Sequence, residues 1–324
     1  MIETVDDIKT IANVGTGTMG HAITLQFALA GYPVHLVGRG EASLEKAMKA
    51  IRSDAEDFAE AGLLKDGDTL DAVLARITGY ADYASGVADV DFVIESVAEN
   101  LDIKKSVWAE VEHAAPKDAI LSTNTSGLSP TALQSVLKKP ERFVVAHFWN
   151  PAQLMPLVEV VPGEKTDPKV VDITFDLMAK IGKKPAKIKK ESLGFVGNRL
   201  QLAVLREASY IVQQGIADAA TVDDVMKYSL GRRWNLVGPL ASIDLGGLDV
   251  FYNISTYLFD DMDNGTGPSP LLAEKVREGN LGAKTGQGFF SWQGEDGKRI
   301  IESRNKALLR ALKNDAADAA AAQA

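Results

Sequence analysis

The sequence predicts an α/β fold, in which a doubly wound parallel sheet covered by helices is followed by an all-α domain. Two observations predict it. Short apolar runs alternate with helix-like segments through the first half of the chain. After about residue 190, apolar residues recur at helical spacing and few strand-like runs remain. A length of 324 residues suits two domains, which we place at residues 1–190 and 191–324.

The expected strands of the first domain are short apolar runs separated by helix-like segments. They lie at Ile8–Val14, Pro33–Val37, Phe92–Ser96, Ala119–Ser122, Arg142–His147 and Leu157–Val161. Helices are expected at Thr18–Ala30 and Glu41–Gly62, on either side of the second strand. The basic, proline-containing stretch Gly182–Gly194 is the expected seam, and Arg199–Gln214 is the expected first helix of the second domain.

Composition and net charge exclude several classes of function. The chain has no cysteine, which excludes thiol nucleophiles, cysteine-ligated zinc and disulfides and fits a reducing compartment. The acidic N-terminus MIETVDDIKT has no features of a secretory signal, so we expect a cytoplasmic protein. No apolar run approaches the roughly 18 residues of a membrane span. A net charge of −9 argues against broad binding to nucleic acid or anionic membranes. We therefore expect a small-molecule substrate and no metal.

Three glycines spaced G-x-G-x-x-G follow the first expected strand and open the first expected helix, in VGTGTMG. This spacing in this context is typical of dinucleotide binding. Gly15 allows the tight turn, Gly17 lets the backbone approach a pyrophosphate, and Gly20 lets the helix pack close to the sheet. The helix N-terminus offers N–H groups to the phosphates. The expected cofactor-binding residues of this loop are Gly15, Gly17, Thr18, Met19 and Gly20.

The end of the second expected strand bears on the choice between NAD and NADP. An acidic residue about 20 positions after the glycines would bind the adenosine ribose 2′-hydroxyl. Gly38 and Arg39 occupy that place, and an arginine pairs well with a 2′-phosphate. The sequence therefore favours NADP(H). NAD(H) stays open because Glu41 is near enough in sequence to reach a ribose hydroxyl, and Arg39 is otherwise a solvated loop charge.

A histidine is the natural group to exchange a proton with a substrate hydroxyl near neutral pH. His147 ends an expected strand and opens the loop HFWNP, and ligands bind beyond the carboxyl ends of strands in open α/β sheets. The other histidines, His21, His35 and His113, are expected to be structural.

Three further polar residues are candidates for the same site. Glu159 lies inside the apolar strand LVEVV, where a buried carboxylate needs a partner, and pairing with His147 would fix the imidazole tautomer. The alternative is an edge strand with Glu159 facing water. Ser126 follows the AILS strand, and Asn198 opens the first helix after the seam. Either of these two is also a plausible helix cap.

Taken together, these stretches resemble the L-3-hydroxyacyl-CoA dehydrogenase family over nearly the whole chain, from Lys9 to Trp292. The matching pieces are VGTGTMG, VIESVAENLDIKK, STNTSGLS, HFWNPAQLMPLVEVV, GFVGNRL, GPLASIDLGGLD and GAKTGQGFFSW. They are long and occur in the family's order, so the resemblance is specific.

The resemblance implies a Rossmann-like N-terminal domain and a helical domain that forms a homodimer. It also implies roles. His147 is similar to the family's acid/base and Glu159 to its orienting partner, while Ser126 and Asn198 match positions that hold the substrate's oxygens. Glu99 and Lys104 match positions at the nicotinamide end of the cofactor. The implied reaction is reversible oxidation of an (S)-3-hydroxyacyl thioester to the 3-ketoacyl thioester.

The sequence departs from the family pattern in three places. Gly38-Arg39 replaces the usual acid, which puts NAD preference in doubt. Ser53–Gly62 is acidic, whereas fatty-acid members tend to carry lysines there, where CoA phosphates dock. Met155–Thr166 is similar to the branch that contains L-gulonate 3-dehydrogenase and lambda-crystallin, which acts on free hydroxy acids. The tail GAKTGQGFFSW instead resembles the hydroxybutyryl-CoA enzymes.

Three functional hypotheses follow. The first is a dehydrogenase for short 3-hydroxyacyl-CoA substrates, such as 3-hydroxybutyryl-CoA. The second is the same chemistry on a free 3-hydroxy acid, such as a sugar acid or a carnitine-like compound, with Arg232 or Arg233 as the carboxylate anchor unless they are a solvated pair. The third is a non-catalytic dinucleotide-binding protein. The third is disfavoured because a structural protein has no use for the full set of candidate residues, which is Ser126, His147, Glu159 and Asn198.

Overall fold

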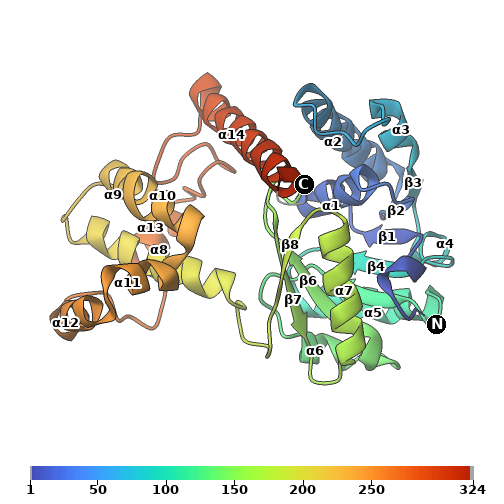
Figure 1. Ribbon diagram of the computed structural model, residues 1–324, viewed down its shortest axis with the longest axis horizontal. Helices are drawn as coiled ribbons and strands as arrows, with labels where there is room; N and C mark the ends of the chain where they lie inside the picture. The colour runs from blue at the N-terminus through green and yellow to red at the C-terminus, as the bar shows by residue number, and fades with distance from the viewer. Residues whose placement is uncertain (1, 322–324) are drawn as a thin grey trace. The chain divides into compact units, whose positions relative to one another are not determined.

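The computed structural model describes residues 2–321, and the chain divides into two compact units (Figure 1). Unit 1 runs to Asn198 and includes the residues from Arg304 onward, and unit 2 is Arg199–Ser303. The division after Asn198 lies eight residues beyond the expected boundary. The reason is local: the backbone N–H groups of Val196 and Gly197 bind the carboxylate of Glu159 in the sheet.

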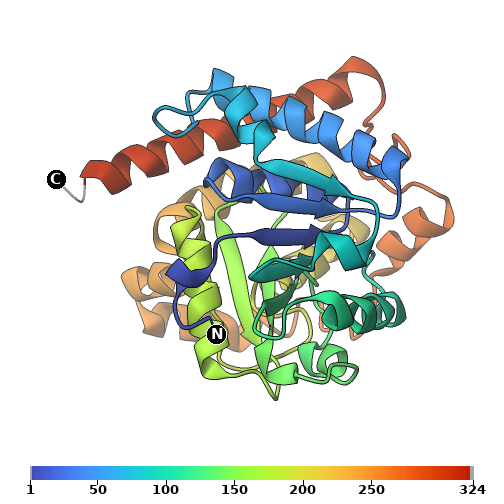
Figure 2. The ribbon, with the colours of Figure 1, turned by 90° about the vertical axis from the view of Figure 1, so that its right-hand side faces the viewer.

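Unit 1 is built on one eight-stranded sheet with the order β3-β2-β1-β4-β5-β6-β7-β8 (Figure 2). Its strands are β1 Ile11–Val14, β2 Val34–Val37, β3 Ile77–Tyr80, β4 Phe92–Glu95, β5 Ile120–Thr123, β6 Phe143–Phe148, β7 Leu157–Pro162 and β8 Lys184–Lys187. All neighbouring pairs are parallel except β6 and β7, which are antiparallel.

Helices cover both faces of this sheet, as in other doubly wound folds (Figure 2). Those before residue 198 are η1 Val5–Asp7, α1 Thr18–Leu29, α2 Glu41–Glu60, α3 Leu70–Ala75, α4 Tyr83–Gly86, α5 Leu101–Ala114, α6 Pro130–Gln134, η2 Pro140–Arg142 and α7 Pro168–Lys180. The expected α/β class is therefore confirmed, and the expected strands and helices are present with ends shifted by a few residues.

Two strands were not expected from the sequence. β3 reads ITGY and β8 reads KPAK, and both lie at an edge of the sheet, where Ile77 is the one buried residue of the two strands. Neither shows the apolar run of a central strand. The first half of the expected seam at Gly182–Gly194 is therefore wrong as a linker, because β8 pairs with β7 along that stretch.

The strand order places the glycine loop at the sheet's switch point. From β1 the chain builds outward through β2 and β3, then crosses to β4 on the other side of β1. The loops after β1 and β4 therefore leave the sheet in opposite directions and open a crevice, the usual ligand position in open α/β sheets. Fully buried apolar side chains on both faces, including Trp108, Phe27 and Phe92, hold the strands in place.

Unit 2 is helical, in agreement with the expected all-α domain. Its helices are α8 Gly197–Gln213, α9 Ala219–Val225, η3 Met226–Leu230, α10 Gly231–Val237, α11 Pro239–Gly246, α12 Leu248–Leu258 and α13 Pro270–Arg277. α8 begins in unit 1, two residues before the division.

The last helix, α14 at Gly294–Ala321, begins in unit 2 and ends in unit 1. Its second half packs on unit 1, where Leu309 is buried and Leu308 and Leu312 pack against the same apolar core as α2. Lys313 Nζ donates a hydrogen bond to the carbonyl of Ala61, at the end of α2. The alanine-rich tail thus extends the helix through Ala321, and its last three residues lie outside the described part. No helix within residues 2–321 is long and apolar enough to cross a membrane.

Candidate active site

The glycine loop joins β1 to α1 in a conformation that only glycine allows at two of its positions. Gly15 has φ +127°, and a Cβ there would lie 2.7 Å from the carbonyl oxygen of Ser96. A Cβ on Gly20 would lie 2.0 Å from the carbonyl oxygen of Gly15. Gly17 faces open space and precedes α1, so the first N–H groups of this helix stay bare for a phosphate.

Asn13, which is not among the residues expected from the sequence, connects the two ends of this loop. Its buried Nδ2 donates hydrogen bonds to the carbonyls of Gly15 and Gly20 at 2.9 and 3.0 Å. Its Oδ1 accepts a hydrogen bond from the Ser96 hydroxyl at 2.9 Å, which joins the loop to the end of β4. An asparagine inside the apolar strand Ile11–Val14 is the one sequence signal for Asn13, and it does not reveal these partners.

A cavity of about 350 Å³ adjoins the glycine loop. Its lining comes from the end of β2, from the loops after β1, β2 and β4, and from α2, α4 and α5. The lining residues are Gly15, Thr16, Gly17, Val37, Gly38, Arg39, Ser43, Tyr83, Ser96, Val97, Ala98, Ile103 and Val107. No carboxylate is among these residues, and Arg39 is their one cation. Of the expected cofactor residues, Gly15, Gly17 and Arg39 line the cavity. Thr18, Met19, Gly20, Glu99 and Lys104 do not.

His147 and Glu159 face each other across the antiparallel pair of β6 and β7. The His147 Nδ1 atom lies 2.9 Å from Glu159 Oε2, and both side chains are almost fully buried. The other carboxylate oxygen accepts hydrogen bonds from the N–H groups of Val196 and Gly197, each at 3.0 Å. Burial opposes the charge of Glu159, but the hydrogen bonds from His147, Gly197 and Val196 outweigh it and lower the pKa of this carboxyl group.

This pairing sets the chemistry of the imidazole. A carboxylate on Nδ1 makes that nitrogen the hydrogen-bond donor, so Nε2 carries the lone pair of the neutral ring. Within residues 2–321, no hydrogen-bond partner contacts Nε2. The rings of Trp149 and Phe195 lie 5.4 and 5.7 Å from the imidazole by centroid distance and limit the access of water.

Ser126 and Asn198 come together with Glu99. The Asn198 amide donates a hydrogen bond to the Ser126 carbonyl at 2.7 Å. Glu99 Oε1 accepts hydrogen bonds from the Ser126 N–H at 2.8 Å and from its hydroxyl at 3.0 Å. Burial raises the pKa of Glu99, but donors from Thr125 and Ser126 and the Lys104 charge outweigh this and lower it.

Lys104 is buried under this cluster. Its ammonium lies 2.7 Å from the carboxylate of Glu95, and the two side chains are 1% and 0% exposed. A second carboxylate, that of Glu99, is 3.5 Å away. The sequence reading did not single out Glu95, although a charged residue at the end of an apolar strand was a usable signal.

Two of the other three histidines, His21 and His35, have local partners. His21 Nδ1 lies 2.9 Å from the Gly17 carbonyl and its Nε2 lies 3.3 Å from Asp54. Burial lowers the pKa of His21, but the contacts with Asp54 and Gly17 outweigh it and raise it. His35 Nδ1 contacts the carbonyl of Gly86, and His113 is exposed on α5.

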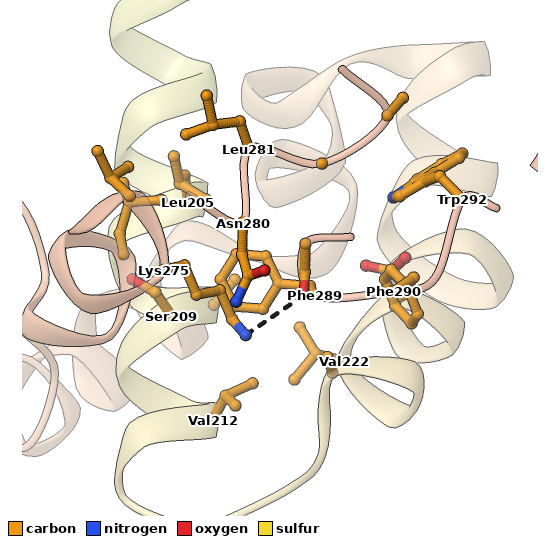
Figure 3. Close-up of a pocket in the computed structure, with 18 of the residues that line it drawn as sticks. Leu205, Ser209, Val212, Val222, Lys275, Asn280, Leu281, Phe289, Phe290 and Trp292 are labelled. Atoms are coloured by element: carbon orange, nitrogen blue, oxygen red, sulfur yellow. Dashed lines mark hydrogen bonds between the residues drawn. The ribbon is translucent and has the colours of Figure 1, made fainter. Parts of the chain in front are cut away.

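Unit 2 holds a larger cavity of about 580 Å³, lined mainly by apolar side chains of α8, α9, α13 and the loop after α13 (Figure 3). Two lysines line it, Lys275 and Lys284. Lys275 Nζ donates a hydrogen bond to the Gly288 carbonyl, 3.3 Å away, and lies over the Phe289 ring. None of the candidate residues above lines it. Arg232 and Arg233 are exposed on α10 and do not line it either. In residues 2–321, no group of three or more potential metal ligands is present.

Comparisons with known proteins agree with this geometry. Residues 10–192 match the NAD binding domain of 3-hydroxyacyl-CoA dehydrogenase, and residues 194–292 match its C-terminal domain. The chain is 34% identical over 303 residues to the 5-formyl-3-hydroxy-2-methylpyridine 4-carboxylate 5-dehydrogenase of Mesorhizobium japonicum, covering 93% of this chain and 96% of that one. It is also 34% identical over 283 residues to the 3-hydroxybutyryl-CoA dehydrogenase of Clostridioides difficile, covering 87% and 99%.

A solved structure extends the likeness to the fold. The crystal structure of a 5-formyl-3-hydroxy-2-methylpyridine 4-carboxylic acid 5-dehydrogenase superimposes with a TM-score of 0.88 at 32% identity, covering 94% of this chain and 99% of that one. Both domain matches and two full-length relatives therefore point the same way. The chain belongs to the 3-hydroxyacyl-CoA dehydrogenase family and is an oxidoreductase of the nicotinamide-dependent dehydrogenase type.

Proposed function

We propose that this protein is an NADP(H)-preferring dehydrogenase that interconverts a hydroxyl and a carbonyl group, with His147 as the acid/base. The observation that carries the proposal is the buried contact between His147 Nδ1 and Glu159 Oε2 at 2.9 Å. It leaves Nε2 as the basic nitrogen, near the carboxyl end of β6, which runs parallel to β5. Glu159 stabilises the imidazolium that forms when Nε2 takes the hydroxyl proton.

Ser126 and Asn198 are proposed to hold the reacting oxygen. The Ser126 hydroxyl donates to Glu99 and keeps its lone pairs free to accept a substrate hydroxyl. Asn198 uses one amide N–H on the Ser126 carbonyl and retains a second for a substrate carbonyl. A bound nicotinamide would supply the chemistry of accepting or releasing the hydride, while these residues orient the substrate and move the proton.

The proposed preference for NADP(H) rests on the cavity beside the glycine loop. Arg39 and Ser43 line it where the chain leaves β2, and the lining has no carboxylate to repel a 2′-phosphate. A guanidinium pairs with phosphate oxygens through two parallel hydrogen bonds. Glu41, the first residue of α2, is the group that would instead support NAD(H) through a ribose hydroxyl.

For the substrate, we propose a free hydroxy acid rather than a CoA thioester. The alignment with the pyridine carboxylate dehydrogenase covers 303 residues. The two family domains end at residue 292, and residues 1–292 are too few for an alignment of that length, so it extends into α14. That relative's name describes a small aromatic acid. The α2 segment that would receive CoA phosphates in the family is acidic here, with Asp54, Asp57 and Glu60. Burial and the neighbouring carboxylates Asp54 and Glu60 raise the pKa of Asp57, which marks excess negative charge.

A short 3-hydroxyacyl-CoA remains the second candidate. The C. difficile 3-hydroxybutyryl-CoA dehydrogenase has the same identity over 283 residues, and this chain covers 99% of it. Both candidates share the proton transfer at His147, so they differ only in what anchors the rest of the substrate.

One assay separates the candidates. Absorbance at 340 nm is followed with NADPH and NADH separately, each with acetoacetyl-CoA, and in reverse with NADP⁺ or NAD⁺ and a panel of free 3-hydroxy and aromatic hydroxymethyl acids. Turnover of a free acid without turnover of acetoacetyl-CoA supports the free-acid proposal. Rapid oxidation of NADPH or NADH with acetoacetyl-CoA would instead support the CoA-thioester candidate. Absence of turnover with either class of substrate would contradict both candidates.

We also propose that the protein is a homodimer joined through unit 2. Large apolar side chains stand exposed on its helices, including Leu236 at 80%, Leu245 at 78% and Leu240 at 75%. Exposed apolar patches of this kind mark protein interfaces. Light scattering after size exclusion tests the proposal, since a mass of one chain would contradict it.

A further inference from the structure

We infer that Glu95 is a positioning residue, which holds the cofactor-lining turn after β4 and the substrate-side residue Ser126 in one arrangement. It is the last residue of β4 and is fully buried. No role in the reaction attaches to it so far. The inference rests on the proposed roles of the cavity beside the glycine loop and of Ser126.

The carboxylate of Glu95 has three donors, each from a different segment. Oε1 accepts a hydrogen bond from the Val97 N–H at 2.6 Å and from Lys104 Nζ on α5 at 2.7 Å. Oε2 accepts one from the hydroxyl of Thr123, its register partner on β5, at 2.7 Å. A buried carboxylate with three short hydrogen bonds, one from an ammonium, is rigidly fixed.

The first consequence concerns the cofactor side. Ser96, Val97 and Ala98 line the cavity, and the hydrogen bond from the Val97 N–H to Glu95 sets the direction in which this turn leaves β4. Lys104 Nζ also donates to the Val97 carbonyl at 3.3 Å. The same turn packs closely against Gly15, whose position has no room for a Cβ beside Ser96. A shift of the turn would therefore change the cavity floor.

The second consequence concerns the substrate side. The Lys104 ammonium lies between two carboxylates, with Glu95 at 2.7 Å and Glu99 at 3.5 Å. Because Glu95 neutralises the buried ammonium, Glu99 is left to accept the N–H and hydroxyl of Ser126. The Thr123 hydroxyl, held by Glu95, is also 3.3 Å from the N–H of Thr125, the residue before Ser126.

Replacing Glu95 by glutamine keeps the volume and removes the charge. The buried ammonium of Lys104 then has Glu99 as its nearest carboxylate, and Glu99 moves toward it and away from Ser126. An unpaired buried charge is costly, so the local structure adjusts until the ammonium is paired again. A purely structural role for Glu95 would instead lower stability and leave binding unchanged.

The test compares Glu95→Gln with Glu112→Gln. Glu112 is a matched control, since its side chain is also nearly buried and lies 3.7 Å from the Arg142 guanidinium. It accepts hydrogen bonds from the N–H groups of Lys138 and Lys139 and does not line the cavity. Dissociation constants for NADPH and NADH are measured by cofactor fluorescence, with thermal unfolding in parallel. We expect Glu95→Gln to weaken binding of the tighter-binding cofactor roughly 10- to 100-fold. Glu112→Gln should change the same dissociation constant less than about twofold. Both variants should lower the Tm. Equal changes in the two variants would overturn the inference.

A double-variant cycle tests the route to Ser126. Ser126→Ala is made in the wild-type and Glu95→Gln backgrounds, and KM is measured with acetoacetyl-CoA or with the free acid found active. We expect a smaller effect of Ser126→Ala in the Glu95→Gln background, because Ser126 is already displaced there; additive effects would contradict this. If Glu95→Gln does not fold, Thr123→Val is used instead, because it removes one hydrogen-bond donor to Glu95 at constant volume. It should also weaken cofactor binding. Cofactor binding is measured without substrate. A wrong substrate assignment would therefore leave this measurement unaffected, so failure of the inference about Glu95 can be distinguished from failure of the proposed function.

Discussion

The two units of this chain differ in how far they bury their apolar side chains. Every buried apolar residue in the described part of the chain belongs to unit 1, and none lies in residues 199–303. Unit 2 instead exposes large apolar residues on α10, α11 and α12. A helical domain without a core of its own buries too little surface to be stable alone. The comparison teaches that unit 1 buries the candidate pair His147 and Glu159 in a core of its own, whereas unit 2 leaves its large apolar residues uncovered.

The largest expected effect tests whether the chemistry belongs to unit 1. His147→Gln removes the base but keeps a hydrogen-bonding side chain, and it should lower kcat by roughly 10²–10⁴. His113→Gln, on the exposed face of α5, is the matched control and should leave kcat unchanged. Initial rates at 340 nm with the active substrate measure both. Similar rates for the two variants would remove His147 from the mechanism.

The next effect sharpens the description of the cofactor cavity in unit 1. Arg39→Asp replaces its one lining cation by a carboxylate. We expect binding of NADPH to weaken roughly 10- to 100-fold, because a charged hydrogen bond is replaced by repulsion, while NADH changes little. Fluorescence titration with each cofactor measures this. Equal weakening of both would show that Arg39 does not contact the 2′-phosphate.

A smaller effect tests the dependence of unit 2 on a covering surface. Leu240 is 75% exposed on α11, and Leu240→Glu should shift the assembly toward single chains by roughly tenfold or more, because a charge is buried in the interface. The control is Leu193→Glu, at a leucine that is 76% exposed in unit 1. Light scattering at a series of concentrations measures the mass. An unchanged dimer in both variants would place the contact elsewhere.

The smallest effect concerns a buried lysine in unit 1. Lys183 Nζ donates to the carbonyls of Ala152 and Met155, in the loop that follows His147 and Trp149. Burial lowers the pKa of this ammonium to about 7, whereas an unfolded lysine titrates near about 10.4. Between these values the unfolded chain binds more protons, so stability rises with pH by up to about 1 kcal/mol per unit.

Lys183→Met should remove this slope. Urea unfolding at pH 7, 8 and 9 gives the free energy of unfolding for both proteins, and the difference between them isolates the lysine. Parallel pH dependences would mean that Lys183 is charged in the folded protein, held by the two carbonyls.

Much of the fold was predictable because central strands of a parallel sheet are continuous apolar runs. The six expected strands and the helices α1 and α2 are present. β3 and β8 escaped because edge strands need no apolar run, and KPAK reads as a linker until its pairing with β7 is seen. The return of α14 to unit 1 was not predictable, because its leucines fit any helical surface.

The site was predictable where one residue type implies its partner. A carboxylate inside the apolar strand LVEVV requires a donor, and the structure places His147 opposite it. Asn13 and Glu95 were not identified, because their partners are backbone groups and side chains from loops that only the fold brings together. The roles of His147, Ser126 and Asn198 in turnover stay predictions.

The path of α14 has a consequence for how the chain is made. Unit 1 is interrupted in sequence by unit 2 and is completed by residues from Arg304 onward. Chains emerge from the ribosome N-terminus first, and domains begin to fold as they emerge. The surface that receives Leu308, Leu309 and Leu312 therefore stays open to water until these three residues have been synthesised. A prematurely terminated chain carries an uncovered apolar patch on unit 1, and such patches promote aggregation.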